Sequence, residues 1–458
     1  MKIAVVILAA GQGTRMRSNI PKVLHPLAGK PMIDYSLEAV QSVTGQAPLV
    51  VIGHGAEAVE QAIGDRARCV VQQPQLGTAH AVQTAAPLLQ GSCDLLLVTA
   101  ADMPLISPQT YQRLIETQKN NTGALTMLSV ELADPHGFGR VVRNADGTVK
   151  CIVEEAQATP DQLTIRELNT AIYCFDAEWL WSALSQIKVS PKGEYYLTDA
   201  IGIATDAGLT VQAIRLENPE EAIGINTRAH LAEAEAVLRR RINLRWMLEG
   251  VTIVDPATTY IEADVQIGQD TVIWPNTYLR GKTVIGQNCV VGPNTMIEDC
   301  QIGDDCTILA TVMEQAVVEN HVEIGPYGHL RKGAHLAEGV HMGNFGEVKN
   351  SYLGPGVKMG HFSYIGDATI GKDVNIGAGT ITCNFDGVRK HRTVIGENTF
   401  IGSDTMLVAP LTIGANAKTG AGAVVTHDVP DNTVVVGVPA RPLRKTSQEK
   451  DPQQDGKQ

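Results

Sequence analysis

A glycine-rich loop near the start of the chain carries the first side chains suited to phosphate chemistry. The stretch LAAGQGTRMRSNIPK directly follows an apolar run and contains two glycines, Gly11 and Gly13, and cations that include Arg15 and Lys22. Glycine lets backbone N–H groups approach a phosphate, and the cations can neutralise its charge. Met16 stands where a dinucleotide-binding fingerprint needs glycine, and no Gly-Lys-Ser/Thr sequence ends a Walker A loop here. The loop therefore predicts a phosphate site of another type.

A single carboxylate, Asp102, follows the apolar run LLLVTAAD. A residue just past a buried strand lies at the carboxyl end of that strand, where α/β sheets bind their ligands. A hard oxygen donor there suits Mg²⁺, which takes few protein ligands besides substrate phosphates. A lone aspartate in a turn is more often structural than a metal ligand, so its position alone does not establish a metal site.

A histidine in the second half, His361 in KMGHFSYIGD, is the other candidate for chemistry. Met359 and Ile365 would point inward, which places His361 at a corner and Tyr364 on the outer face. This excludes a packed core histidine but leaves a surface corner and a catalytic base open. Basic residues nearby favour the base, because Arg and Lys could hold a phosphate while a histidine accepts an ammonium proton near neutral pH.

Two patterns must position these side chains. Up to about residue 228, runs such as IAVVILAA and DLLLVTAAD alternate with helical stretches, which predicts a doubly wound α/β domain. The next twenty or so residues are rich in Ala, Leu, Glu and Arg and end at Gly250, which predicts a helix.

The rest of the chain is governed by a period of six. Aliphatic residues, most of them followed by glycine, recur at this spacing, as at Ile395, Ile401, Leu407 and Ile413. Such a period is typical of a parallel β-helix built from hexapeptide repeats. We therefore expect an α/β domain over residues 1–228, a linker helix over 229–249, a β-helix over 250–445 and a disordered tail over 446–458.

Composition narrows the classes of function. The chain has 458 residues and a net charge of −12, which argues against a nucleic-acid or membrane-surface binder but not against small anionic ligands. The eight cysteines form no CxxC or zinc-type cluster, so free thiols in a reducing cytosol are expected. No segment has the length needed to span a bilayer, and we expect a cytoplasmic protein.

The motifs also resemble those of known enzymes. The loop Leu8-Ala9-Ala10-Gly11-x-Gly13-Thr14-Arg15, followed by Pro21-Lys22, is similar to that of the sugar-nucleotide pyrophosphorylases, nucleotidyltransferases of the GT-A-like fold. The segments QQPQLGTAHAV, GFGR, IVEE, ELNTA and KMGHFSYIGD resemble the bacterial bifunctional N-acetylglucosamine-1-phosphate uridyltransferase/glucosamine-1-phosphate N-acetyltransferase family. The resemblance covers the chain apart from its tail.

This resemblance implies a GT-A/Rossmann-like domain, then a left-handed parallel β-helix that forms a homotrimer. The second half would acetylate glucosamine-1-phosphate with acetyl-CoA. The first half, with Mg²⁺, would join the product to the uridylyl group of UTP and release pyrophosphate. The final product, UDP-N-acetylglucosamine, implies a role in supplying bacterial cell-wall and envelope precursors.

The resemblance assigns roles to residues of the first domain. Arg15 and Lys22 would act on the phosphates, and Asp102 and Asn226 would bind Mg²⁺. Contacts to UTP or UDP-N-acetylglucosamine are implied for Leu8, Ala9, Ala10, Gly11, Lys22, Gln73, Gly77, Thr78, Gly139, Glu154, Asn169 and Asn226. The sequence departs from the family at Ala100-Ala101, where Tyr-Gly is frequent, and at Gln12, where Lys is common.

In the second domain the resemblance makes His361 the general base and Glu347 its orienting carboxylate. Glucosamine-1-phosphate would be bound by Arg331, Lys349, Tyr364, Asn375 and Lys390. Acetyl-CoA would be bound by Ala378, Asn384, Phe385, Ser403, Ala421 and Arg441. Phe385 stands where Tyr is common, so a hydroxyl contact is lost there.

Two other interpretations compete with this one. The β-helix could merely oligomerise a nucleotidyltransferase, as in ADP-glucose pyrophosphorylase-like proteins, but the basic residues grouped with His361 argue against this. The chain could also be a scaffold without activity, like the pyrophosphorylase-related translation-factor subunits. The presence of Arg15, Lys22 and Asp102 argues against that.

Overall fold

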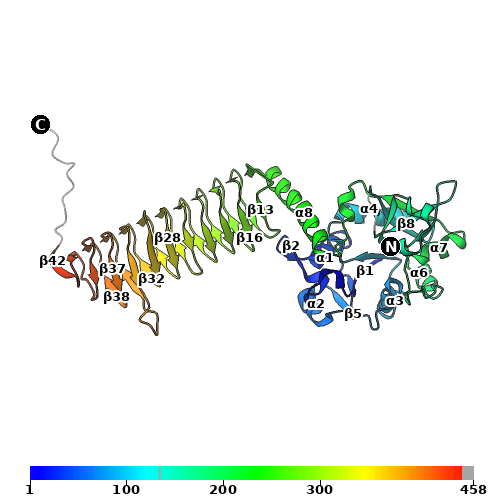
Figure 1. Cartoon of the computed structure of the whole chain (residues 1–458), viewed down its shortest axis with the longest axis horizontal. Helices are drawn as coiled ribbons and strands as arrows, with labels where there is room; N and C mark the ends of the chain where they lie inside the picture. Colours follow the sequence, from blue (N-terminus) through cyan, green and yellow to red (C-terminus); the bar gives the residue numbers. More distant parts are fainter. Residues whose placement is uncertain (134, 136, 446–458) are drawn as a thin grey trace. The chain divides into compact units, whose positions relative to one another are not determined.

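The computed structural model of the protein describes residues 1–133, 135 and 137–445 (Figure 1). The tail predicted over 446–458 lies outside the described residues. The chain divides into two compact units, Met1–Leu238 and Arg239–Gln458. Among the described residues, no helix is both long and apolar enough to cross a membrane. All eight cysteines are free thiols.

The first unit is built on a twisted sheet whose main path runs β11-β7-β10-β6-β1-β4-β5. Strands β1, β4, β5 and β6 are parallel, whereas β10 lies antiparallel between β6 and β7. The β8–β9 hairpin pairs with β10 at the side of this path. The strands are β1 (Ile3–Ala9), β4 (Leu49–Ile52), β5 (Arg68–Val71), β6 (Leu95–Ala100), β7 (Leu125–Glu131), β8 (Gly139–Arg143), β9 (Val149–Val153), β10 (Glu167–Asp176) and β11 (Val211–Arg215), with a small β2–β3 pair (Pro26–Leu27, Lys30–Pro31).

Helices pack on both faces of this sheet. Along β1, Val5 and Ile7 belong to one buried cluster and Val6 to the other, so the strand is apolar on both sides. One cluster also contains residues of α1, α2 and α4, and the other contains residues of α3, α6 and α7. The helices are α1 (Met32–Thr44), α2 (Ala56–Ile63), α3 (Thr78–Leu89), α4 (Pro108–Asn120), α5 (Pro160–Leu163), α6 (Ala177–Leu184) and α7 (Asp199–Asp206). The α/β class predicted from the alternating pattern is confirmed.

Helix α8 (Arg228–Leu248) occupies the stretch in which a linker helix is predicted, and it is packed at both ends. In the first unit, Ala234 and Val237 are buried in a cluster with Met32. In the second unit, Asn243 Nδ2 donates to the carbonyls of Pro256 and Thr259, 3.0 Å in each case. The helix is therefore part of the core of each unit rather than an exposed spacer.

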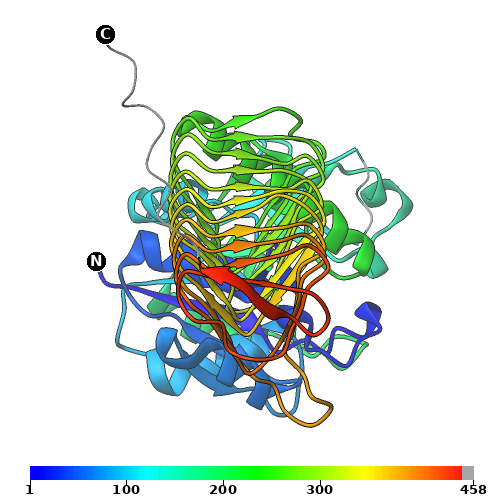
Figure 2. The same ribbon diagram turned by 90° about the vertical axis from the view of Figure 1, so that its left-hand side faces the viewer.

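The second unit is a three-sided parallel β-helix, seen as a stack of coils in Figures 1 and 2. Successive strands of the chain fall on three sheets in rotation, which we call face 1, face 2 and face 3. This is the left-handed β-helix expected from the hexapeptide repeats and the family resemblance.

The strands of each face are short. Face 1 contains β12 (Thr252–Ile253), β15 (Val272–Ile273), β18 (Val290–Val291), β21 (Thr307–Ile308), β24 (Glu323–Ile324), β27 (His341–Met342), β30 (Lys358–Met359), β33 (Asn375–Ile376), β36 (Phe400–Ile401), β39 (Lys418–Thr419), β41 (Thr433–Val436) and β42 (Arg441–Lys445). Face 2 contains β13 (Tyr260–Ile261), β16 (Tyr278–Arg280), β19 (Met296–Glu298), β22 (Val312–Glu314), β25 (His329–Leu330), β28 (Gly346–Lys349), β31 (Ser363–Gly366), β34 (Ile381–Cys383), β37 (Met406–Val408) and β40 (Val424–Val425). Face 3 contains β14 (Gln266–Ile267), β17 (Val284–Ile285), β20 (Gln301–Ile302), β23 (Val317–Val318), β26 (His335–Leu336), β29 (Tyr352–Leu353), β32 (Ala368–Ile370), β35 (Thr393–Ile395) and β38 (Leu411–Ile413).

The period of six arises because one residue of each strand points into the coil. Met359 on face 1 and Ile365 on face 2 are both 0% exposed, as the spacing predicts. His361 lies between them at an exposed corner. The regular coil is interrupted between β34 and β35, where residues 384–392 form a projecting hairpin, orange in Figure 1. The fold therefore leaves corners, outward faces and one insertion to carry chemistry.

Candidate active sites

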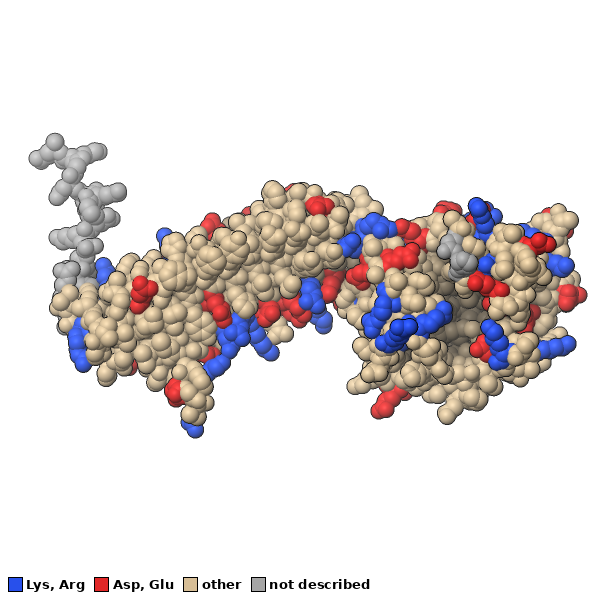
Figure 3. Space-filling view, in the orientation of Figure 1, with Lys and Arg blue, Asp and Glu red and all other residues tan. Residues whose placement is uncertain are grey.

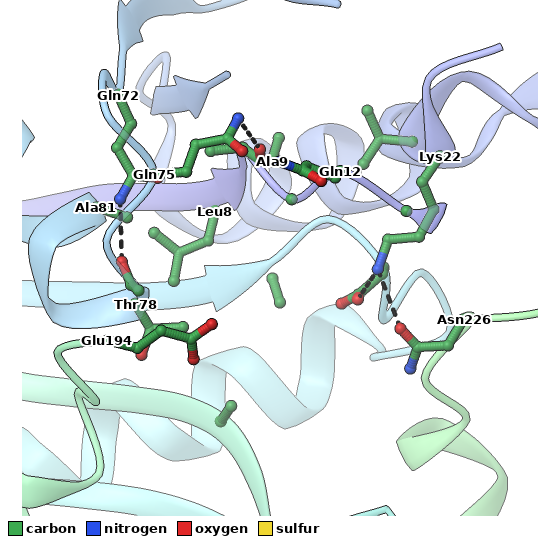
Figure 4. Close-up of a pocket in the computed structure, with 18 of the residues that line it drawn as sticks. Leu8, Ala9, Gln12, Lys22, Gln72, Gln75, Thr78, Ala81, Glu194 and Asn226 are labelled. Carbon is green, nitrogen blue, oxygen red and sulfur yellow. Dashed lines mark hydrogen bonds and ion pairs between the residues drawn. The ribbon is translucent and has the colours of Figure 1, made fainter. Parts of the chain in front are cut away.

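A cavity of about 660 Å³ lies at the carboxyl ends of β1 and β6. Predicted site residues that line it are Leu8, Ala9, Ala10, Gly11, Arg15, Lys22, Gly77, Thr78, Asp102 and Asn226. Lining residues that the sequence analysis did not assign include Gln72, Gln75, Ala171, Glu194 and Tyr196. Figure 4 shows the cavity with the glycine-rich loop along one side and Glu194 opposite it. The parallel register of β1 and β6, in which Leu8 pairs with Ala100, brings these segments together.

Four polar side chains meet at one end of this cavity. Lys22 Nζ lies 2.5 Å from Asp102 Oδ2 and donates to Asn226 Oδ1 at 3.2 Å (Figure 4). Arg15 also donates to Asn226 Oδ1, at 3.0 Å. The backbone N–H of Ile225 donates to the Asp102 carbonyl at 2.8 Å, which joins the two loops. The oxygens of Asp102 and Asn226 thus already surround one cation, the Lys22 ammonium, and hard oxygen donors of this kind fit a divalent metal ion.

Gly13 allows Lys22 to reach this position. Its φ of +62° is left-handed, and a Cβ at residue 13 would lie 2.7 Å from the Lys22 Cβ. A side chain there would push Lys22 away from Asp102, so the second glycine of the loop is needed for both conformation and space.

The structure corrects the prediction for Gln73. Gln73 is exposed and outside the cavity lining, whereas Gln72 is 4% exposed and lines it. Gln72 Nε2 donates to the Gly77 carbonyl and contacts His80 Nδ1, both at 3.0 Å. Consecutive residues of an extended segment point to opposite sides, so only one of the two glutamines can face the cavity. The sequence alone does not say which side of the segment the cavity lies on.

The predicted sugar contacts form a neighbouring cluster. Asn169 of β10 pairs with Gly139 of β8, and the Glu154 carboxylate oxygens lie 3.7 Å from where a Gly139 Cβ would be. Glu154 accepts a hydrogen bond from Thr198 Oγ1 at 3.0 Å, and burial raises the pKa of its carboxyl group. The Asn169 amide is held by the buried Tyr173 hydroxyl, to which its Nδ2 donates at 2.8 Å. The cluster therefore presents a carboxylate and an amide to a polar ligand.

In the second unit, predicted site residues gather around the corner between faces 1 and 2. Backbone bonds stack this corner from coil to coil, from Gly379 N to the Phe362 carbonyl, from Asp404 N to Ala378 and from Gly422 N to Ser403, at 2.6 to 2.8 Å. Ala378, Ser403 and Ala421 consequently lie in one column below His361 and Phe362. Three of the six residues assigned to the acetyl donor are therefore brought together with the candidate base.

The structure does not place Glu347 against His361. Glu347 forms an ion pair with Arg331, 2.9 Å from Oε1 to Nη1, and its register partner on the next coil is Tyr364. His361 Nδ1 lies 3.3 Å from Asn344 Oδ1 instead. The reason is geometric, because Glu347 points outward from the flat of face 2, whereas His361 lies at the corner.

A group of basic side chains lies on the opposite edge of face 2. Lys390 of the hairpin comes close to Lys349, and this neighbour, with Arg331, lowers the pKa of the Lys349 ammonium. Figure 3 shows Lys and Arg, interspersed with Asp and Glu, along the lower edge of the β-helix. Cations placed this close together favour an anionic ligand.

Other predicted residues lie further apart within the single chain. Asn375 points outward from face 1, in register with Lys358 and Phe400, and so lies on the other side of the His361 corner from Tyr364. Phe385 is 59% exposed at the base of the hairpin. Arg441 is exposed on β42, where it pairs with Val436 in the last turn of face 1.

Comparison with known proteins gives matches for both units. The MobA-like NTP transferase domain matches residues 5–145, and the bacterial transferase hexapeptide (six repeats) matches 282–313 and 392–427. The chain is 46% identical over 440 residues to "Bifunctional protein GlmU" of Pelobacter propionicus, covering 95% of both chains. It is 46% identical over 438 residues to the protein of the same name from Geotalea uraniireducens, covering 95% of this chain and 96% of the relative. The Streptococcus agalactiae serotype V relative is 45% identical over 433 residues, 94% of each chain.

Proposed function

The chain belongs to the family of bifunctional GlmU proteins, and from this premise we propose that each of its two units carries one reaction of UDP-N-acetylglucosamine synthesis. The observation that carries the proposal is that two separate sets of charged side chains converge. One surrounds the cavity of the first unit, and the other lies on face 2 of the β-helix, whose opposite edge carries His361.

In the first unit we assign uridylyl transfer. An oxygen of N-acetylglucosamine-1-phosphate attacks the α-phosphorus of UTP, the bond to the β-phosphate breaks, and pyrophosphate leaves. Arg15 and Lys22 neutralise the charge that gathers around the phosphorus. Gln72 at the far side of the cavity is suited to hydrogen-bond the uracil, and Glu154 with Asn169 to bind the sugar.

Nucleotidyl transfer in this family calls for a divalent metal ion, and we propose Mg²⁺. Asp102 and Asn226 would hold it, since their oxygens converge on one point. When bound, the ion supplies positive charge to the triphosphate. The protein's own part is to keep the two oxygens in place through the bond from Ile225 to the Asp102 carbonyl.

In the second unit we assign acetyl transfer. The amine of glucosamine-1-phosphate attacks the thioester carbonyl of acetyl-CoA, a C–N bond forms, the C–S bond breaks, and CoA leaves as its thiol. His361, exposed at the corner, takes the ammonium proton so that the amine can attack. Arg331, Lys349 and Lys390 bind the sugar phosphate. Glu347 orients Arg331, not the histidine.

We further propose that the enzyme works in the cytoplasm as a homotrimer assembled through its β-helix. Relatives that match nearly the whole chain and are named bifunctional favour two activities over a β-helix that only oligomerises. Light scattering on the purified chain would test the trimer, because a monomer or dimer at micromolar concentration would contradict it.

Product analysis by substrate omission tests the function. With glucosamine-1-phosphate, acetyl-CoA, UTP and Mg²⁺ present, mass spectrometry should detect UDP-N-acetylglucosamine, CoA and pyrophosphate. Omitting acetyl-CoA should stop product formation, and supplying N-acetylglucosamine-1-phosphate should restore it. Failure of acetylation alone would leave a monofunctional nucleotidyltransferase, the alternative interpretation.

A further inference from the structure

The carboxylate of Asp367 is held between two side-chain amides from neighbouring coils. Asn350 Nδ2 donates to Oδ1 at 2.6 Å and Asn384 Nδ2 donates to Oδ2 at 2.5 Å. Asp367 occupies the corner between faces 2 and 3 with a left-handed φ of 52°. Because an ionised carboxylate only accepts hydrogen bonds, both amides must turn their nitrogen toward it. The orientation of the Asn384 amide is therefore determined by Asp367.

Asn384 is also the first residue of the projecting hairpin. The backbone carbonyl of Asn384 accepts a hydrogen bond from His391 N at 2.7 Å, and Phe385 forms an antiparallel bridge with Lys390. Inside the hairpin, the Asp386 carboxylate accepts from Val388 N and Arg389 N, both at 2.7 Å. The hairpin is thus closed on itself and is attached to the coil below it at both ends, through the Asp367–Asn384 pair and through Arg392, whose guanidinium donates to Thr369 Oγ1.

Two further features keep this attachment in place. A Cβ on Gly366 would collide with the Tyr364 hydroxyl and lie 2.8 Å from Asn384 Nδ2, so both side chains cross the space above this glycine. Thr382 occupies an inward position that is usually aliphatic, and its hydroxyl accepts from Gly366 N at 2.7 Å. The inward hydroxyl of Thr382 thereby holds the end of β31, at Gly366, close to the side-chain amide of Asn384.

We propose that Asp367 is a positioning residue that anchors the hairpin and turns the side-chain oxygen of Asn384, Oδ1, toward the ligand. Among the described residues Asn384 Oδ1 has no hydrogen-bond partner, and Asn384 lies beside Tyr364. Asn384 is only 7% exposed, and an amide oxygen accepts hydrogen bonds, so this oxygen recognises an N–H donor, either the amine of the amino sugar or an amide of the acyl donor. Anchoring also holds Lys390 next to Lys349. This inference rests on the acetyl-transfer function proposed above.

A reciprocal exchange of the two side chains tests the proposal. Asp367→Asn removes the constraint and lets the Asn384 amide reverse. Exchange of the backbone amides of residues 385–391 should accelerate, and KM should rise about tenfold for the substrate that donates the N–H, with a smaller change in kcat. The affected substrate, amino sugar phosphate or acetyl-CoA, identifies the donor. The double variant Asp367→Asn with Asn384→Asp restores an amide–carboxylate pair with an oxygen toward the ligand, and should recover both quantities.

Asp299→Asn is the matched control. Asp299 lies at the same corner on an earlier coil with the same φ of 52°, and its carboxylate accepts from Lys282 N at 2.9 Å. Its substitution should change neither hairpin exchange nor KM. Amide protection of β18 to β27 reports whether the coil remains folded. If Asp367→Asn unfolds it, Asn384→Asp, which opposes two carboxylates, should release the hairpin by itself.

Unchanged hairpin exchange in Asp367→Asn, or no recovery in the double variant, would overturn the inference. Exchange is measured without substrates, so it decides the anchoring even if acetyl transfer is absent. Absence of acetyl transfer in the unaltered protein would instead refute the proposed function.

Discussion

Lys22 and Asp102 are in direct contact, with 2.5 Å between Nζ and Oδ2, although they are 80 residues apart in the chain. The Lys22 side chain is 11% exposed and the Asp102 side chain 25% exposed, so the pair lies partly shielded at the end of the cavity. This contact brings the cation assigned to the phosphates and the carboxylate assigned to the metal to one point. The glycine-rich loop therefore contributes to a charged site in the cavity and is not merely a solvated surface loop.

Replacing Asp102 should therefore remove one activity only. Asp102→Ala leaves the Lys22 charge unpaired and removes a metal ligand, so uridylyl transfer should fall at least about a hundredfold. Acetyl transfer, in the other unit, should be unchanged. Asp65→Ala, at an exposed site of the same unit, serves as control. Chelation of divalent ions should reproduce the selective loss, and equal loss of both activities would contradict the assignment.

The converse is expected for the β-helix. His361→Ala removes the general base and should lower kcat for acetyl transfer about a hundredfold or more, with uridylyl transfer intact. His341 is an exposed histidine of face 1, paired with Glu323 at 2.9 Å, and His341→Ala should be neutral. Coupled assays of both reactions on the same preparation make the comparison. Full acetyltransferase activity in His361→Ala would refute the base.

Glu347 should affect binding rather than proton transfer. Since Glu347 pairs with Arg331, Glu347→Gln should loosen that guanidinium and raise KM for glucosamine-1-phosphate about tenfold. The pH dependence of kcat should be unchanged, because His361 contacts Asn344. A shifted kcat–pH profile with unaltered KM would show that the carboxylate acts on the histidine after all.

Substitutions of Gln72 and Gln73 should show which of these two adjacent glutamines contacts UTP. Gln72→Ala removes a buried side chain that lines the cavity and should raise KM for UTP about tenfold. Gln73→Ala changes an exposed residue and should leave KM within about twofold of the unaltered value. Initial rates at varied UTP measure both, and the opposite ranking would restore Gln73 as the contact.

Glu154 should make the first unit sensitive to pH. Burial raises its pKa in the folded state, so as pH rises the unfolded state loses this proton first and stability falls through the range up to the folded-state pKa. Glu154→Gln carries no charge to bury. It should have a higher Tm than the unaltered protein at neutral pH, and the difference should shrink in acid, where both are uncharged. Thermal unfolding at several pH values checks the sign, and weaker binding of the sugar nucleotide should accompany the gain.

Much of the architecture could be predicted from the chain because local patterns repeat. Inward positions such as Met359 and Ile365 follow from the period of six, and the period also places His361 at a corner. The apolar run of β1 predicts a strand buried on both faces. Motif resemblance identified the phosphate-binding loop that lines the first cavity, because a glycine-rich loop after a strand is a local structure.

What the sequence determined by itself was thus the class of each unit and the types of side chain available. The tertiary structure decided which of them meet. Gln72 rather than Gln73 enters the cavity, and Arg331 rather than His361 receives Glu347. Asp367 reaches Asn384 only because one coil lies on the next. These contacts depend on side-chain direction and on the stacking of coils about seventeen residues apart. Local sequence patterns do not determine either of them.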